Sequence, residues 1–134
     1  MADFLTAYKK TSVNEGGYSN DPADKGGETW KGIARKKHPF WVGWQIIDSQ
    51  KSKPDFPKCL YKIPELEDKV QTMYKYTFWT EIKGAHINEQ AIADSLYDST
   101  VNMGPGAAIK LAQRALGIKE TGVMDEETLK TING

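Results

Sequence analysis

The chain has 134 residues, a length that fits one compact domain with a small helical extension. Its 18 basic and 18 acidic residues balance, which excludes the strongly basic surface that drives nonspecific binding to nucleic acid. Hydrophobic residues make up 39% of the sequence, which argues against disorder, and no apolar run approaches the roughly 20 residues that cross a bilayer. We therefore expect no nucleic-acid partner and no integral membrane segment.

The amino end lacks the basic and then apolar order of a signal peptide, so we expect synthesis in the cytoplasm without that export route. Cys59 is the single cysteine and cannot form an internal disulfide. No metal-ligand spacing surrounds it, and we interpret it as a small buried hydrophobic residue. His38 and His86 are far apart in sequence, so no zinc site is predicted.

The first half of the chain predicts one clear helix and a polar loop. Phe4, Leu5 and Tyr8 begin an apolar stripe at helical spacing, and the glycine pair at 16–17 is a natural stop. Residues 18–28 are dense in turn formers and predict a structured loop or a short hairpin. Thr29 is then expected to cap a short helix that runs through Lys37.

The second half predicts a series of amphipathic helices. One helix is expected around Trp41, Trp44, Ile46 and Ile47, and the next begins at Pro64 and follows Leu66, Val70, Met73 and Tyr74. A third covers roughly Glu89 to Met103, with Ile92 and Leu96 facing inward. A fourth has Ala108, Ala112, Ala115 and Leu116 on one side, and Asp125 is expected to cap a last one. The predicted fold class is all-α, or mainly α, with a small glycine-rich loop or hairpin near the amino end.

Glu15 is the residue most indicative of chemistry. If the first helix persists to its glycine stop, Glu15 returns to the apolar face of Phe4 and Tyr8, because each helical residue turns the chain by about 100°. Partial burial and the negative end of the helix dipole both favour the protonated acid, which is the form that a general acid needs. The alternative is an ordinary solvated glutamate at a helix end.

Asp21 and Asp24 are the candidates for a second, ionised carboxylate. Glycosidic cleavage commonly uses such a partner to activate water or to stabilise the positive charge of the sugar in the transition state. Both aspartates lie in the polar loop, where solvent and backbone N–H groups favour the charged form. Their alternative role is to stabilise turns.

The glycine-rich stretch carries a resemblance to a known family. Its elements are Glu15-Gly16-Gly17-Tyr18, Asp24-Lys25-Gly26-Gly27-Glu28-Thr29 and Gly32-Ile33. This pattern resembles the signature of glycoside hydrolase family 108, muramidases that cut between N-acetylmuramic acid and N-acetylglucosamine. Residues 94–104, 113–117 and 122–129 are similar to the helical peptidoglycan-binding segment that follows in that family.

The resemblance implies a set of roles. Together with a similarity to the Glu, Asp, Thr arrangement of phage-type lysozymes, it implies Glu15 as the acid, Asp24 as its ionised partner and Thr29 as a hydroxyl that positions water. Helix capping is the alternative for Thr29. The implied lysozyme-like catalytic domain covers residues 1–88, and the peptidoglycan-binding segment covers 89–134. The implied enzyme needs no metal or other cofactor and acts as a monomer on peptidoglycan glycan strands.

Three further residues are candidate substrate contacts. Tyr18 and Trp30 flank the loop and are expected to form walls of a sugar groove, because aromatic rings pack against the apolar faces of sugars. Core packing is the alternative for Trp30. The resemblance implies that Asn102 binds an N-acetyl group, with a helix-terminus role as the alternative. Trp41, Trp44, Phe78 and Trp79 are assigned to the core or its edge.

Two readings compete with hydrolysis. A noncatalytic wall-binding module would keep the aromatic residues and the carboxy-terminal helices without needing Glu15. A secretion-accessory protein is the other alternative, since relatives of the family are associated with protein movement through the wall. For a hydrolase, we expect action in the periplasm or cell wall, after non-classical or holin-type export.

Overall fold

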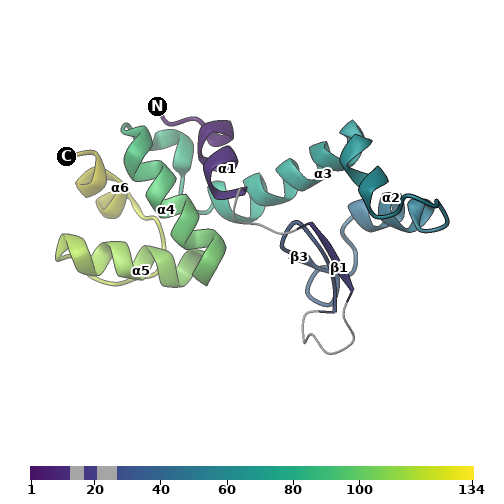
Figure 1. Cartoon of the computed structure of the whole chain (residues 1–134). Helices are drawn as coiled ribbons and strands as arrows, with labels where there is room; N and C mark the ends of the chain where they lie inside the picture. Colours follow the sequence, from purple (N-terminus) through teal and green to yellow (C-terminus); the bar gives the residue numbers. More distant parts are fainter. Residues whose placement is uncertain (13–16, 21–26) are drawn as a thin grey trace. The chain divides into compact units, whose positions relative to one another are not determined.

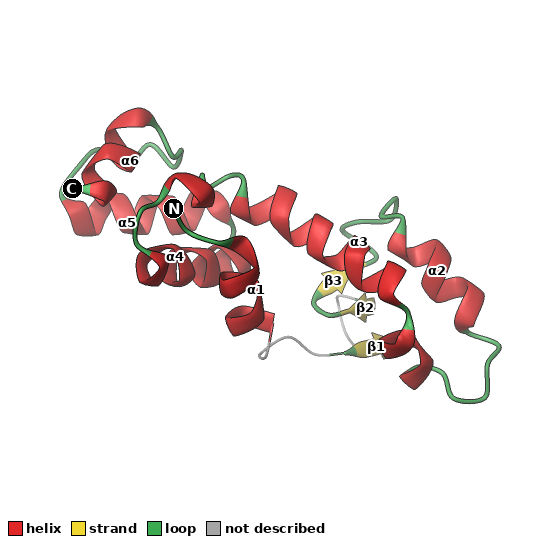
Figure 2. Cartoon of the chain, turned by 90° about the horizontal axis from the view of Figure 1, so that it is seen from above, coloured by secondary structure: helices red, strands yellow, loops and turns green. Residues whose placement is uncertain are grey.

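The computed structural model describes residues 1–12, 17–20 and 27–134. Six α-helices and one small three-stranded sheet lie in these described residues, so the predicted mainly helical class is confirmed (Figures 1 and 2). The chain divides into two compact units. The first combines residues 1–12 with 73–134, and the second spans residues 13–72.

The second unit is built on an antiparallel sheet in the order β1 (Tyr18–Asn20), β2 (Glu28–Trp30) and β3 (Ile33–Ala34). Lys31 and Gly32 join β2 to β3 with positive φ angles of 46° and 84°, the backbone of a tight hairpin turn. The predicted helix from Thr29 to Lys37 is therefore wrong. Thr29 pairs with Ser19 on β1 and has no helix to cap. Pairing between strands outweighs the weak local capping signal.

The helical part of this unit is α2 (Gly43–Gln50), the 3₁₀ helix η1 (Lys58–Lys62) and α3 (Pro64–Tyr74) as far as Thr72. The predictions of a helix around Trp44 and of one that begins at Pro64 are confirmed. Trp30, Trp44, Ile47, Leu60, Leu66 and Val70 are fully buried and form the centre of the core. Cys59 is buried and free, as predicted.

The first unit contains α1 (Phe4–Ser12), the π-helical η2 (Lys75–Trp79), the 3₁₀ helix η3 (Gly84–His86), α4 (Gln90–Met103), α5 (Pro105–Leu116) and α6 (Glu126–Asn133). Helix α4 packs against both α1 and α5. Phe4 lies in contact with Trp79 and Tyr97, with ring centroids 5.8 Å apart in each pair. This aromatic cluster joins helices that are distant in sequence, and burial of such rings is a main stabilising term.

The ends of these helices follow the predicted signals. The Asp125 carboxylate accepts a hydrogen bond from the backbone N–H of Thr128 at 2.9 Å, which confirms it as the N-cap of α6. Ile92 differs from its prediction. It is 37% exposed, whereas Leu96 on the same helix is buried. The spacing identified the correct face of α4, but Ile92 borders an open groove.

Candidate functional site

The two predicted catalytic carboxylates, Glu15 and Asp24, lie outside the described residues, as does Asp21. The prediction that the first helix persists to Glu15 falls there too, because the described part of α1 ends at Ser12. The sheet that follows Glu15 in the chain is described. Its first anchor is Gly17, whose carbonyl oxygen accepts a hydrogen bond from the Lys31 N–H at 3.1 Å.

The sheet separates the candidate residues onto two faces. Side chains alternate along a strand, so Glu28 and Trp30 share one face of β2 and Thr29 lies on the other. Tyr18 pairs with Trp30 and therefore shares the face of the buried indole, while Ser19 pairs with Thr29. Trp30 is only 1% exposed, which agrees with the core-packing alternative. Thr29 is half-buried beside the exposed Ser19.

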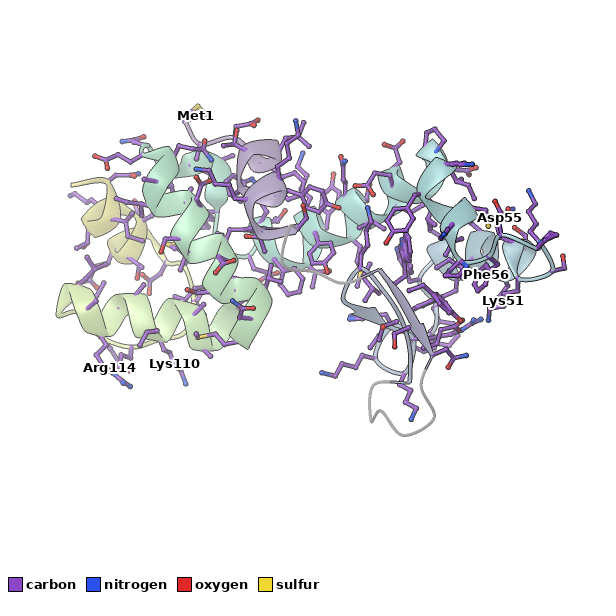
Figure 3. All side chains as sticks on the ribbon, in the orientation of Figure 1. Met1, Lys51, Asp55, Phe56, Lys110 and Arg114 are labelled. Atoms are coloured by element: carbon purple, nitrogen blue, oxygen red, sulfur yellow. The ribbon has the colours of Figure 1, made fainter. Side chains whose placement is uncertain are left out.

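A charged network lies under the buried face of the sheet. The Glu28 carboxylate, 9% exposed, accepts hydrogen bonds from the Tyr18 hydroxyl at 2.6 Å and from Arg35 at 2.8 Å, and pairs with Lys51 Nζ at 2.7 Å. The Arg35 guanidinium also donates two hydrogen bonds to the Asp48 carboxylate, each 2.8 Å long. Lys51, labelled in Figure 3, follows α2, so the network ties β1 and β2 to that helix.

The network fixes the charge states of its members. Burial alone raises the pKa of Glu28, but hydrogen bonds from Lys51, Tyr18 and Arg35 outweigh it, and the pKa lies below its ordinary value. The hydrogen bonds from Arg35 hold the pKa of Asp48 far below its usual range. Burial and the neighbouring Glu28 carboxylate raise the pKa of Tyr18. Glu28 is thus an anion that supports the sheet.

Tyr61 is an exposed aromatic residue that the sequence reasoning did not single out. The centroid of its ring lies 5.1 Å from that of Trp30, and Lys31 Nζ lies 5.7 Å from the Tyr61 ring centroid. The residue as a whole is 63% exposed. The Tyr61 hydroxyl occupies the space that a Cβ at Gly17 would fill, so a larger residue at position 17 would displace the Tyr61 side chain. Tyr61 stands in a lysine-rich connection without apolar periodicity, and no sequence signal pointed to it.

Asn102 belongs to the first unit and is exposed in the last turn of α4. Its side-chain amide donates to Asp98 at 3.4 Å, and Asp98 in turn accepts from the Thr11 hydroxyl at 3.1 Å. Asn102 is therefore a helix-terminus residue with its amide at the surface. Its contact with an N-acetyl group stays a prediction.

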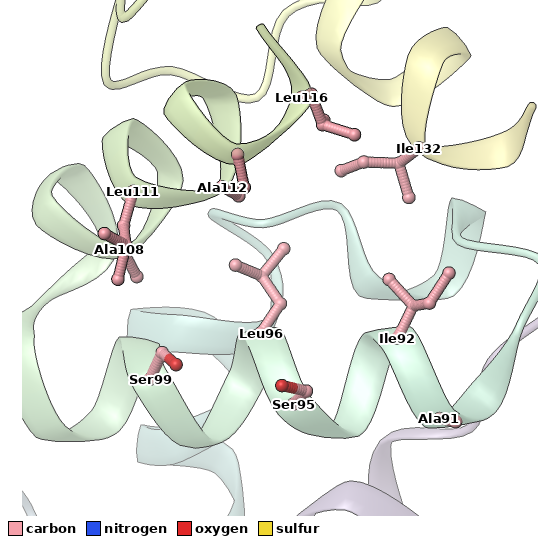
Figure 4. Close-up of a pocket in the computed structure, with 11 residues that line it drawn as sticks. Ala91, Ile92, Ser95, Leu96, Ser99, Ala108, Leu111, Ala112, Leu116 and Ile132 are labelled. Carbon is pink, nitrogen blue, oxygen red and sulfur yellow. The ribbon is translucent and has the colours of Figure 1, made fainter.

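An apolar groove of about 470 Å³ lies among α4, α5 and α6 (Figure 4). Its walls include Ile92 and Leu96 from α4, Leu111 and Leu116 from α5, and Ile132 from α6. Ser95 and Ser99 are its only polar lining residues among those that the structure describes. A sugar needs several hydrogen-bond partners to replace water, so this groove is a poor glycan site.

Metal-ligating side chains do not gather in the described residues. No group of three or more His, Cys, Asp or Glu side chains is placed there to hold an ion. In the same part of the chain, every helix is too short or too polar to cross a bilayer.

The sequence matches the model of a known protein family. Residues 8–104 match the family Glycosyl hydrolase 108, and the chain belongs to that family of glycoside hydrolases. The matched range contains Glu15, Asp24, Thr29 and Asn102 together with Tyr61. No curated protein matches the chain significantly.

Among solved structures, the fold is similar to that of SagA from Brucella abortus. The TM-score is 0.65 and the sequences are 22% identical, with the match covering 96% of this chain and 67% of that chain. At this identity the likeness concerns the fold alone.

Proposed function

We propose that this chain is an N-acetylmuramidase that hydrolyses the β-1,4 bonds between N-acetylmuramic acid and N-acetylglucosamine in peptidoglycan. The observation that carries the proposal is family membership over residues 8–104, the range that includes the carboxylates Glu15 and Asp24. The described part of the site adds the strand β2, which bears Thr29 and begins at Glu28, four residues after Asp24 in the sequence.

The proposed reaction begins with proton transfer from the Glu15 carboxyl group to the bridging oxygen, which leaves with N-acetylglucosamine as the bond from the muramic acid C1 breaks. Positive charge develops on C1 and the ring oxygen, and the Asp24 carboxylate stabilises it. Water then adds to C1, and its proton passes to a carboxylate. The products are a new reducing end on muramic acid and a free 4-hydroxyl group, with no cofactor consumed.

The described residues support this chemistry in two ways. The Glu28 network ties β2 to α2, so the Thr29 hydroxyl is held on a fixed strand rather than on a loop. The exposed ring of Tyr61, held against Trp30, offers an apolar surface against which a sugar can pack. Tyr61 is therefore our candidate for the sugar contact, and the buried Trp30 supports its ring.

Mass spectrometry of products released from purified peptidoglycan tests the proposal. We expect reducing-end muramic acid from the wild type, and a rate about 10²- to 10⁴-fold lower from Glu15→Gln, because the amide cannot donate the catalytic proton. Glu89→Gln is the matched control, since Glu89 is exposed and its side chain does not cap α4. Reducing-end N-acetylglucosamine from the wild type, or full activity in Glu15→Gln with intact folding, would overturn the assignment. Binding without cleavage by the wild type would favour a noncatalytic wall-binding role.

A further inference from the structure

A second cavity in the first unit, about 450 Å³ in volume, is lined by residues of η2, η3 and α6. Trp79 forms a buried floor, and Ala85 and Leu129 add apolar walls. Lys75, Lys83 and His86 stand around it and are exposed. The cavity therefore combines an apolar interior with a basic rim.

No acidic side chain of the described residues forms an ion pair with the basic rim. In the ranges 1–12, 17–20 and 27–134, the ion pairs include none of Lys75, Lys83 and His86, and no lining residue of the cavity is acidic. Elsewhere in this unit Lys10 pairs with Asp94, and Arg114 pairs with Glu120. Lys75 and Lys83 are cations without acidic partners in these ranges, and two such cations at one cavity favour an anionic ligand there.

The backbone beneath the rim is unusual and well fixed. Residues 75–79 form a π-helix, a feature that is rare and often found at functional sites, and the Thr80 N–H closes it onto the Lys75 carbonyl at 2.9 Å. Lys83 has a left-handed conformation with φ of 50°, which is uncommon for a residue with a Cβ. Gly84 lies directly against the Trp79 ring, where any Cβ would collide with the indole.

Hydrogen bonds from helix α6 also fix the backbone around His86. The Asn133 side-chain amide donates to the His86 carbonyl at 2.9 Å, and its oxygen accepts from the Asn88 N–H at 2.9 Å. Helix α6 is thereby joined to the segment that follows η3. Lys83 thus lines the cavity from a left-handed backbone position that ordinarily favours glycine.

We propose that this cavity binds the free carboxylate of a short peptide with small alkyl side chains. The carboxylate meets Lys75, Lys83 and His86, and the alkyl groups meet Trp79, Ala85 and Leu129. A free phosphate uses only the rim, whereas an amphiphilic carboxylate uses both the rim and the interior. Peptide branches of peptidoglycan carry such groups, so the identity of the physiological ligand, though not the site itself, rests on the proposed function.

The test is an NMR titration of the ¹⁵N-labelled full chain with N-acetyl-D-alanyl-D-alanine, and with its carboxy-terminal amide. We expect saturable shifts of the amides at positions 75–86 and of the Trp79 indole with the acid, and none with the amide. Lys83→Gly removes the cation while relieving the left-handed strain, so it should fold normally and weaken binding roughly fivefold. Lys119→Ala, at an exposed lysine outside the cavity, should leave affinity unchanged.

Equal binding of the amide, shifts located away from the cavity, or unaltered affinity in Lys83→Gly would overturn the proposal. Inorganic phosphate is the further probe, and binding as tight as that of the peptide would exclude a role for the apolar interior. The titration does not depend on hydrolysis. If the titration fails but the wild type releases fragments with reducing-end muramic acid, only the peptide site is rejected. If the titration succeeds but no such fragments are released, only the muramidase assignment is rejected.

Discussion

Replacing Glu28 with Gln should destabilise the unit that carries the sheet. The carboxylate receives bonds from Tyr18, Arg35 and Lys51. All three are charge-assisted, two of the donors are cations, and a hydrogen bond to a charged group contributes about 1.5–3 kcal/mol when well buried. The Arg35 and Lys51 side chains are 34% and 39% exposed and keep Asp48 as a partner, so solvent screening reduces their share. In Glu28→Gln the side-chain carbonyl oxygen can still accept a hydrogen bond. The NH₂ group takes the place of the second carboxylate oxygen, however, and there it meets a donor instead of an acceptor.

The expected loss is about 2 kcal/mol in the free energy of unfolding, or about 6–10 °C in Tm for a chain of this size. Urea unfolding followed by tryptophan fluorescence measures it, since three of the four tryptophans belong to this unit. Glu120→Gln is the control. Glu120 pairs with Arg114 at 2.9 Å on the open surface, and its loss should leave the unfolding midpoint nearly unchanged.

The pH dependence gives a second measure of the same network. The pKa of Glu28 is lowered in the folded chain, so its contribution is fully present above its ordinary value of 4.5 and is lost as the pH falls through the folded pKa. The stability difference between wild type and Glu28→Gln should therefore be constant near neutral pH and shrink in acid. A difference that is no larger than that of Glu120→Gln, or that does not change with pH, would refute the reasoning.

Two further substitutions test other parts of the molecule. Gln113→Leu should lower the free energy of unfolding in urea by about 2–3 kcal/mol. The reason is that the buried amide donates to the Val123 carbonyl at 3.1 Å and accepts from the Gly122 N–H at 3.0 Å. An unfolding midpoint like that of the wild type would contradict this. Thr29→Val keeps the shape and the strand preference, so stability should hold while turnover falls at least about tenfold if the hydroxyl positions water. Thr29→Ser should then restore turnover, and full activity in Thr29→Val would remove Thr29 from the mechanism.

Much of the helical framework could be predicted because helices are encoded locally. The apolar spacing that begins at Pro64 and the capping signal of Asp125 each involve residues within a few turns, and the structure contains both features. The face of α4 was also predictable. Whether a neighbour covers each residue of that face was not, and Ile92 borders an open groove for that reason.

Beyond the alternative of a short hairpin over residues 18–28, the sheet could not be predicted from the same kind of signal. Strands of two or three residues have little preference of their own and form only by pairing, so the segment after Thr29 resembled a capped helix. The Glu28 network has the same origin. Arg35 and Asp48 are separated by 12 intervening residues and meet only once the hairpin and α2 are packed. Nothing in their sequence spacing indicates an ion pair.

The arrangement of β2 relates stability to the proposed chemistry. Glu28 and Thr29 are adjacent in sequence, but alternation sends one side chain into the charged network and the other to the opposite face. A helix in this segment would turn the two side chains by only about 100° and would not separate them so cleanly. A strand, by contrast, allows the network to fix the backbone while its members stay away from Thr29. The buried anion can therefore hold its charge without presenting another carboxylate on the face of the sheet that bears Thr29.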